Sequence, residues 1–323
     1  MSITFGFTIP QRGALIGVAP LADLLELAPA AEAAGLFDSV WVGDSLIAKP
    51  RPESIGLLGA LAAMTEELTL GVGCMASFTV RDPVTFAYQW ATLDQVSGGR
   101  MLLAACTGIV PGKSAQEGVF FGGIKDADRA ALLEENIQLC RELWTGEPLD
   151  FSGRFHSYEG IEIQPSPVQD PCPIWIAANP APGKYFKRSM QRVAKFADGF
   201  QTCVMAPGAL QAMMTELRPR LVEAGRDPAT FPVMPYHNIN IGSDRAECLT
   251  ESKRFLDAYY GPIFDESKVE SWTAAGSPEE CVQHLRGLVE QGATSITLRC
   301  TSWDQTGQLK RMSEEVLPAL QDG

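Results

Sequence analysis

Eight apolar, strand-like segments recur along this chain of 323 residues, and polar residues cluster directly after their C-terminal ends. The segments are rich in valine, isoleucine and phenylalanine and do not alternate with polar residues, which is typical of parallel strands buried on both faces. Helical patterns lie between them, so each strand and the helix after it form one βα unit, and eight such units predict a (β/α)8 barrel. We expect the strands at residues 3–9, 39–42, 68–74, 101–106, 174–178, 199–203, 233–241 and 295–300.

The spacing of the strands is uneven, and the excess length predicts insertions. Residues 107–173 separate the fourth and fifth strands, which is about twice the roughly 30 residues of a βα unit. Within this segment, the sequence predicts a glycine-rich loop at residues 107–123 and a hairpin at residues 148–173. A second insertion is expected near residues 259–277. Insertions at the C-terminal ends of strands are candidate lids, and a single domain over residues 1–323 is expected.

Proline and glycine mark the boundaries of several predicted helices. Pro29 must kink or interrupt the helix after the first strand. Asp82 and Pro83 predict a helix start, with a capping carboxylate followed by proline at the first helical position, and Gly98 predicts its end. A further helix is expected to end at Gly146.

Composition narrows the class of protein. The net charge of −13 disfavours nucleic acid and anionic membranes as partners, because the average surface would repel them. The N-terminal sequence has no secretory pattern, and the longest apolar-rich run, residues 55–64, is too short to cross a bilayer. The eight cysteines include no C-x-x-C pair and none at zinc spacing from a histidine. We therefore expect a cytoplasmic protein with free thiols and no metal.

Polar residues follow several predicted strands, at the end where barrels of parallel strands carry out chemistry. The residues that follow strands are Gln11 and Arg12, Asp44 and Ser45, Thr107, and Asn179. His237 and Asn238 lie within the seventh strand, and residues 299–303 close the eighth. Alternatives stay open for individual residues. Asp44 could cap the next helix, Arg299 could pair with a barrel carboxylate, and His237 could be a buried core histidine.

Other charged residues are expected at the surface. His156 and His284 lie in an insertion and on a helix, which favours exposed positions. The basic residues of the segment 184–195 predict a solvated helix face, although its first turn could hold a phosphate with the help of Lys184. The sequence contains no Walker loop, Gly-x-Gly-x-x-Gly motif, Ser-His-Asp pattern or metal cluster.

Several phrases together resemble the bacterial luciferase-like family of flavin- and deazaflavin-dependent oxidoreductases. The most specific is Thr92-Leu93-Asp94-Gln95-Val96-Ser97-Gly98-Gly99-Arg100. The others include residues 35–44, 70–74, 81–83, 143–147, 173–178, 197–200 and 276–280, so the resemblance covers nearly the whole chain.

The resemblance implies a barrel that holds reduced flavin or a 5-deazaflavin at its C-terminal mouth. The ring would rest on the third strand at Gly73-Cys74, where family members often have a non-proline cis peptide. By position, the ring would be bordered by Asp44, Thr107 and Gly108, and the ribityl-phosphate would be approached by Ala177, Ala178 and Asn179. His237 matches a histidine of the family's sulfonate-type monooxygenases, and Arg299 lies near the family's arginine on the eighth strand. With Ser45, they are the predicted catalytic residues, and Lys184 is a predicted cofactor-binding residue. The resemblance also implies a homodimer.

Three departures from the family pattern narrow the expected chemistry. Many relatives have histidine after the second-strand aspartate, where this chain has Ser45, and sugar-phosphate dehydrogenases of the family have glutamate where this chain has Ile109. The glycine pair that often follows the fifth strand is replaced by Ala178-Asn179. The missing acid/base pair argues against sugar-phosphate dehydrogenase chemistry. It leaves His237 as the preferred proton-transfer residue.

Three functions are compared. The preferred one is a two-component monooxygenase, in which a separate NAD(P)H:flavin reductase delivers reduced FMN and oxygen is transferred to a small organic substrate. The alternative is hydride transfer with a reduced deazaflavin, which does not activate oxygen. The third is a flavin-binding barrel without catalysis. The sequence does not identify the substrate.

Overall fold

A computed structural model describes residues 3–108, 112–180, 183 and 185–321. The chain divides into two compact units. Unit 1 comprises Met1–Trp41 and Ala178–Gly323, and unit 2 comprises Val42–Ala177. No helix within the described ranges is long and apolar enough to cross a membrane.

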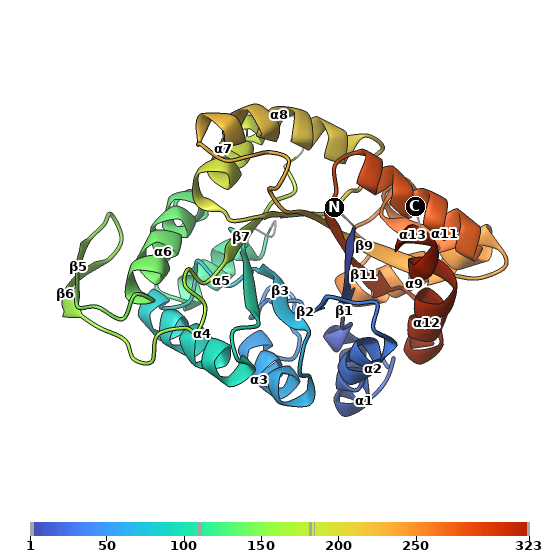
Figure 1. Ribbon diagram of the computed structural model, residues 1–323, viewed down its shortest axis with the longest axis horizontal. Coiled ribbons are helices and arrows are strands. Elements are labelled where there is room, and N and C mark those ends of the chain that lie inside the picture. The colour runs from blue at the N-terminus through green and yellow to red at the C-terminus, as the bar shows by residue number, and fades with distance from the viewer. Residues whose placement is uncertain (1–2, 109–111, 181–182, 184, 322–323) are drawn as a thin grey trace. The chain divides into compact units, whose positions relative to one another are not determined.

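Unit 1 contains both ends of the chain (Figure 1). Its strands are β1 (Thr4–Thr8), β2 (Ser39–Val42, whose last residue opens unit 2), β8 (Phe200–Thr202), β9 (Val233–Ile241), β10 (Thr273–Gly276) and β11 (Ser295–Cys300). Its helices are η1 (Gln11–Leu15), α1 (Leu21–Leu25), α2 (Leu27–Ala34), α7 (Phe186–Phe196), α8 (Ala209–Glu223), α9 (Arg245–Tyr260), α10 (Glu266–Ser271), α11 (Pro278–Glu290), α12 (Gln305–Arg311), η2 (Met312–Val316) and α13 (Leu317–Gln321).

The strands of unit 1 pair in parallel. β1 lies between β2 and β11, β11 pairs with β9, and β9 also pairs with β8 and β10. In this register Arg299 lies opposite Asn238, and Gln201 lies opposite Met234. Because successive side chains of a strand point to opposite faces, Gln201, Asn238 and Arg299 share one face of the sheet and His237 points to the other.

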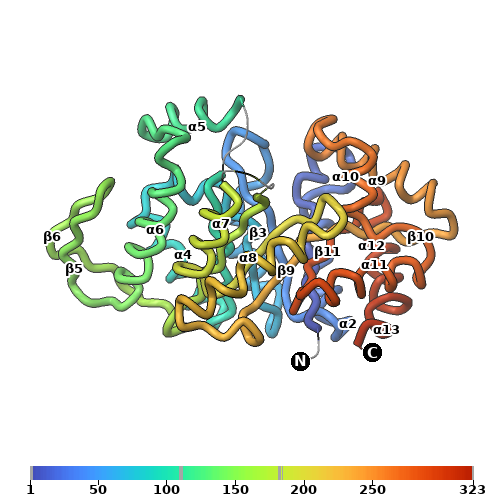
Figure 2. Tube along the Cα trace, turned by 90° about the horizontal axis from the view of Figure 1, so that it is seen from above, coloured from blue at the N-terminus to red at the C-terminus, as the bar shows by residue number. Residues whose placement is uncertain are grey.

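Unit 2 has three parallel strands and a separate hairpin. Its strands are β3 (Thr69–Met75), β4 (Met101–Ala105) and β7 (Ile174–Ala177), in the order β3-β4-β7, with β5 (Leu149–Ser152) and β6 (Ser157–Ile161) antiparallel. Its helices are α3 (Ser54–Met64), α4 (Pro83–Ser97), α5 (Ser114–Phe120) and α6 (Arg129–Leu143). Figure 2 shows the hairpin beside α6 and away from β3.

The predicted strands are confirmed. Each of the eight expected segments corresponds to a parallel strand, with ends that differ by at most one residue. The hairpin within residues 148–173 is also confirmed, and the insertion near residues 259–277 contains α10 and β10. Strand and helix alternate through both units, which is the chain order of a (β/α)8 barrel. The single domain remains a prediction, since the structure is described as two units.

Two of the predicted helix boundaries hold as well, whereas α6 ends at Leu143, before the end predicted at Gly146. The segment before Gly35 forms two helices that break at Glu26, and Pro29 occupies the first turn of α2, where a missing N–H costs little. Asp82 caps α4 by accepting a hydrogen bond from the backbone nitrogen of Thr85 at 2.8 Å, and α4 ends at Gly98 with φ of 70°.

The prediction that residues 107–123 form only a loop is wrong, because α5 lies within them. Glycine within this segment weakens the helical signal of the sequence. Tertiary contacts hold the helix instead. Arg129 donates to the carbonyl oxygen of Ser114 at 2.8 Å, and a side chain at Gly118 would meet the carbonyl oxygen of Ile124 at 2.0 Å.

Candidate functional site

Asp44 joins the end of β2 to the turn after β3, and its side chain is buried. Its carboxylate accepts hydrogen bonds from the hydroxyl of Ser54 at 2.8 Å and from the backbone nitrogen of Ser77 at 2.7 Å. Arg81 lies 3.3 Å from the same carboxylate and also pairs with Glu53. Glu53, not Asp44, caps α3. Asp44 is therefore the centre of a buried polar network and not a simple helix cap.

Gly73 and Cys74 lie at a bulge near the end of β3, where the register against β4 shifts. The peptide bond between them is cis, as the family resemblance implied. The Sγ atom of Cys74 lies 2.8 Å from the Sγ atom of Cys106, which follows the last residue of β4. The ends of β3 and β4 are thus joined through side chains as well as through the backbone.

Thr107 and Gly108, which follow β4, also contact the turn after β3. A Cβ atom at Gly108 would lie 1.8 Å from the carbonyl oxygen of Ala76, and the φ of Gly108 is +65°. Glycine is therefore required on both counts, because L-residues disfavour this backbone region and no space exists for a side chain. The carbonyl oxygen of Thr107 accepts hydrogen bonds from Thr79 and Arg129.

Arg129 is the buried cation that fixes the segment after β4. It pairs with Asp126 at 3.1 Å and lies 3.9 Å from Glu117, which is itself buried. Glu117 in turn accepts weak hydrogen bonds from the backbone nitrogens of Ile47 and Ala48. One ion pair therefore connects α5 and α6 to the loop that follows Asp44.

Arg299 is a fully buried cation on β11 of unit 1. Its Nη2 donates to the Oδ1 atom of Asn238 and its Nη1 to the hydroxyl of Tyr260, both at 2.7 Å. Its Cζ atom lies 4.7–5.5 Å from the ring centroids of Tyr236, Tyr259, Tyr260 and Trp272. Within the described ranges it pairs with no carboxylate, and its Nε has no hydrogen-bond partner. The barrel carboxylate considered as its partner is not observed.

Gln201 adds a second donor to this face of unit 1. Its Nε2 is buried and has no hydrogen-bond partner in the described part of the chain. Because Gln201 shares its sheet face with Arg299, the face presents two incompletely satisfied donors. Buried donors without partners are rare in native proteins, so this face is suited to an acceptor from a ligand.

His237 lies on the opposite face of β9, against α11. Its Nε2 atom is 2.9 Å from the Nε2 atom of His284, and its side chain is fully buried. This position does not fit the proton-transfer role predicted for His237, because its ring points away from Arg299. His284, which was predicted at the surface, is half-buried; its ring contacts His237, and burial shifts its pKa to about 4.

The histidine pair makes stability depend on pH. Burial, followed by the neighbouring His284, holds the pKa of His237 well below 6.5, and burial also lowers the pKa of His284. Above about pH 6.5 both histidines are neutral in the folded and unfolded states; below it, only the unfolded state gains protons. We expect the free energy of unfolding to fall between pH 6.5 and 4.5, and to fall less in the His237→Phe, His284→Leu double variant. Urea titrations of the wild type and the double variant at several pH values in this range measure the difference. An equal fall of the free energy of unfolding in the two proteins would contradict the prediction.

The remaining predicted residues have local partners. The hydroxyl of Ser45 accepts a hydrogen bond from the backbone nitrogen of Lys49. Asn179 accepts from Thr202 and from the backbone nitrogen of Cys203, which ties down the end of β8. Ala177 ends β7, and the backbone nitrogen of Ala178 donates to Gln201. Lys184 and Ile109 lie outside the described residues. The contact of these residues with a cofactor stays a prediction.

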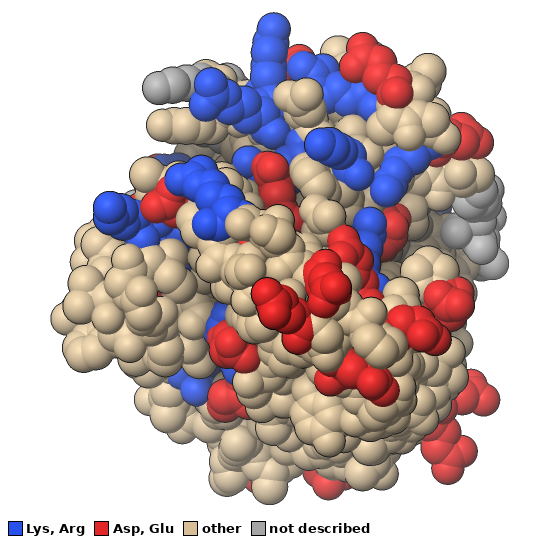
Figure 3. Space-filling view, turned by 90° about the vertical axis from the view of Figure 1, so that its left-hand side faces the viewer, with Lys and Arg blue, Asp and Glu red and all other residues tan. Residues whose placement is uncertain are grey.

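The basic run on α7 forms a solvated face, as predicted. Lys187, Arg188 and Lys195 are exposed, whereas Met190 and Val193 are buried. Figure 3 shows lysine and arginine side chains gathered on part of the face that it presents.

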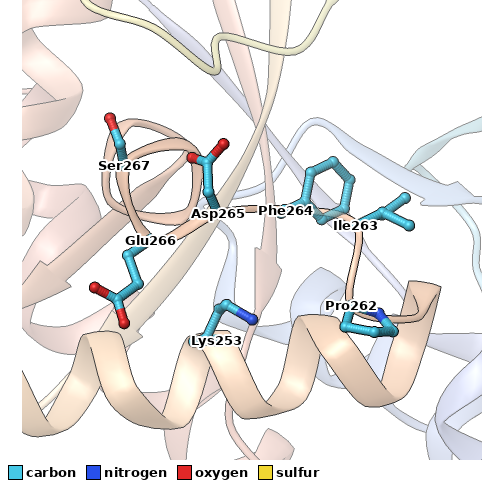
Figure 4. A pocket seen from close by; sticks show the side chains of 7 residues that line it. All are labelled: Lys253, Pro262, Ile263, Phe264, Asp265, Glu266 and Ser267. Carbon is cyan, nitrogen blue, oxygen red and sulfur yellow. The ribbon is translucent and has the colours of Figure 1, made fainter.

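One surface hollow lies between α9 and the segment that leads into α10 (Figure 4). It is lined by Lys253, Pro262, Ile263, Phe264, Asp265, Glu266 and Ser267. Two of its three charged groups are paired locally, Lys253 with Asp257 and Asp265 with Lys268. The lining therefore offers no unpaired cation for an anionic ligand. No cluster of three metal-ligating side chains occurs among the residues that the structure describes.

Sequence reasoning missed several residues of the Asp44 and Arg129 networks. Arg81 was noticed only as part of a family phrase, and Ser77 and Thr79 belong to the turn after β3. Glu117 and Arg129 lie in the insertion that was predicted as a loop and the helix after it. The opposite charges of Glu117 and Arg129 did not predict their ion pair, because that contact depends on how the insertion folds back.

Comparison with known proteins identifies the fold and the family. An F420-dependent glucose-6-phosphate dehydrogenase of Nakamurella multipartita is 27% identical, over 92% of each chain. Among solved structures, an F420-dependent secondary alcohol dehydrogenase has a TM-score of 0.82 at 19% identity and covers 99% of both chains. A monooxygenase from Streptomyces bottropensis has a TM-score of 0.79 at 20% identity, over 98% of this chain and 99% of that chain. The predicted (β/α)8 barrel is confirmed by this likeness. Residues 3–269 match the luciferase-like monooxygenase family, and the chain therefore belongs to that family.

Proposed function

We propose that this protein is a deazaflavin-dependent oxidoreductase that transfers a hydride between F420 and a small organic substrate. The observation that carries the proposal is the F420 dependence stated for several relatives that match nearly the whole chain in sequence. The alternative weighed from the sequence thus replaces the preferred monooxygenase. Oxygenation with reduced FMN is the second candidate, favoured by the structural likeness to a monooxygenase.

The ends of β3 and β4 fit a flat ring. Among their residues, Gly73, Cys74, Ala76 and Thr107 are partly exposed, whereas Val72, Met75 and Ser77 are buried. The exposed strip is therefore small and uncharged, which suits the face of a tricyclic ring. Asp44 and Arg81 do not form part of this strip, because their charged groups are engaged with each other and with Ser77.

Two roles in the reaction are proposed for residues of this chain. When bound, a reduced deazaflavin supplies a hydride and does not react with oxygen. Asp44 would hold the strip in shape by fixing the turn after β3 through Ser77. Arg299 would bind an anionic group of the substrate, because a buried guanidinium with aromatic neighbours and no carboxylate leaves its charge uncompensated.

The proposal does not extend to glucose 6-phosphate as the substrate. The family resemblance implies a histidine at Ser45 in many relatives and a glutamate near Ile109 in the sugar-phosphate dehydrogenases, and this chain has neither. His237 does not replace them, since it faces α11. The proton that accompanies the hydride is therefore assigned to no residue of the chain.

Titration with cofactors tests the proposal. We expect F420 to bind at least about ten-fold more tightly than FMN or reduced FMN, which corresponds to about 1.4 kcal/mol. The reduced F420 complex should persist after mixing with oxygen. Binding is followed by fluorescence and the oxygen reaction by stopped-flow absorbance. Preferential binding of reduced FMN with a transient absorbance on oxygen mixing would support the monooxygenase, and no binding of any of the three would exclude both.

A further inference from the structure

Cys74 and Cys106 stand at the ends of neighbouring strands with their sulfur atoms 2.8 Å apart. We infer that this pair is an oxidation site, which hydrogen peroxide converts to a disulfide and thiols reduce again. We further infer that the disulfide weakens cofactor binding; this second part rests on the proposed function, whereas the first does not.

The geometry needs only a small movement to form the bond. A disulfide has a sulfur–sulfur distance of about 2.05 Å, so the two sulfur atoms must approach by roughly 0.8 Å. β3 and β4 pair in parallel up to this point, and the bulge at Gly73 and Met75 turns the Cys74 side chain toward β4. The packing of Gly108 against Ala76 keeps the two strand ends together in the reduced protein.

The two thiols are not equivalent. Cys74 is partly exposed, whereas Cys106 is buried. The hydrogen bond from Cys106 lowers the pKa of the Cys74 thiol, and the same contact together with burial raises the pKa of Cys106 well above its usual value. The thiolate is the form that attacks an oxidant, and it requires access. Cys74 is therefore the attacking residue and Cys106 the resolving one.

The reaction balances with peroxide as the oxidant. The Cys74 thiolate attacks one peroxide oxygen, the oxygen–oxygen bond breaks, and the products are a Cys74 sulfenic acid and, after protonation, water. The Cys106 sulfur then attacks the Cys74 sulfur, the sulfur–oxygen bond breaks, and a second water leaves with the Cys106 proton. The two thiols lose two electrons and two protons in total, and hydrogen peroxide is reduced to two waters.

Burial disfavours the thiolate form of three other cysteines. Burial raises the pKa of both Cys281 and Cys300 to about 12, and it raises the pKa of Cys140 further. Cys203 is partly exposed like Cys74, so it serves as a matched control for simple accessibility.

Oxidation would alter the strip on which the ring is proposed to lie. Cys74 is one of its four residues, and bond formation draws its sulfur toward Cys106 and away from the reduced position. We therefore expect the oxidised protein to bind F420 about ten-fold more weakly than the reduced protein.

Intact-mass measurement after peroxide treatment tests the site. The reduced full-length protein should lose about 2 Da, regain it with dithiothreitol, and yield a peptide linking Cys74 to Cys106. Cys74→Ser should abolish the loss, Cys106→Ser should stop at a Cys74 sulfenic acid trapped by dimedone, and Cys203→Ser should behave like the wild type. A gain of oxygen without loss of hydrogen in the wild type, or a different linked pair, would overturn the inference. The wild-type peptide map decides the matter even if a variant does not fold.

F420 titration of the reduced and oxidised wild type tests the consequence. Equal affinities of the two forms would overturn the weakening of cofactor binding while the oxidation site stands. If neither form binds F420, the proposed function fails, and the 2 Da loss still reports on the thiol pair by itself.

Discussion

Replacing Arg129 with methionine is expected to lower the free energy of unfolding by about 3–5 kcal/mol. Arg129 is fully buried and pairs with Asp126 and Glu117, so its removal leaves the buried Glu117 without its cation. It also removes the donor to the carbonyl oxygen of Ser114. A buried acceptor that loses its partner bears the full cost of leaving water. Urea unfolding monitored by circular dichroism measures the change.

A surface ion pair in the same unit is the control. Arg154 pairs with Asp128 at 2.6 Å, but its side chain is 64% exposed. Arg154→Met should therefore cost no more than about 1 kcal/mol. Adding Glu117→Gln to Arg129→Met should recover part of the loss, since it removes the uncompensated charge. If Arg129→Met were as mild as Arg154→Met, the ion pair would not be holding the segment after β4.

Gly108→Ala is expected to be about as damaging, with a loss of roughly 3–5 kcal/mol or failure to accumulate as folded protein. Two costs add at this position. The backbone at φ of +65° disfavours any L-residue, and the added Cβ would lie 1.8 Å from the carbonyl oxygen of Ala76, a backbone atom that cannot rotate away. Thermal and urea unfolding give the size of the effect.

Gly112→Ala separates the two costs. Gly112 also has a positive φ, +74°, but none of the described residues lies within 4 Å of a Cβ built there. We expect this variant to lose only about 1–2 kcal/mol, the cost of the backbone conformation. The difference between the two variants is then the cost of separating Gly108 from Ala76. Equal losses would mean that the ends of β3 and β4 can move apart freely.

The strands and the turns between them were predictable because they depend on local chemistry. Continuous apolar runs mark strands buried on both faces, and Asp82-Pro83 and Gly98 set helix ends by capping and backbone preference. The hairpin of β5 and β6 was also found from its proline, glycine and aromatic content. The helix α5 was not, because its segment is held by the distant Arg129 and not by its own propensity.

The candidate site was predictable only in part. Asp44, Cys74 and Gly108 were recognised from phrases whose positions at strand ends are set by the barrel order. The partners that fix them, such as Ser77, Arg81 and Ala76, come from other turns and carry no mark in the sequence. The proton-transfer role predicted for His237 gains no support from its position, because its ring faces α11.

The sequence by itself determined the alternation of strands and helices, the ends of several of these elements, and the family. The tertiary structure alone decided which way each buried side chain points. β9 is apolar enough to be buried on both faces, so its composition cannot tell His237 from Asn238. The register against β11 places Asn238 beside Arg299, and the two-residue period of a strand then turns His237 to α11. The face to which a side chain of a strand points depends on how that strand pairs, and the paired strands lie far apart in the chain.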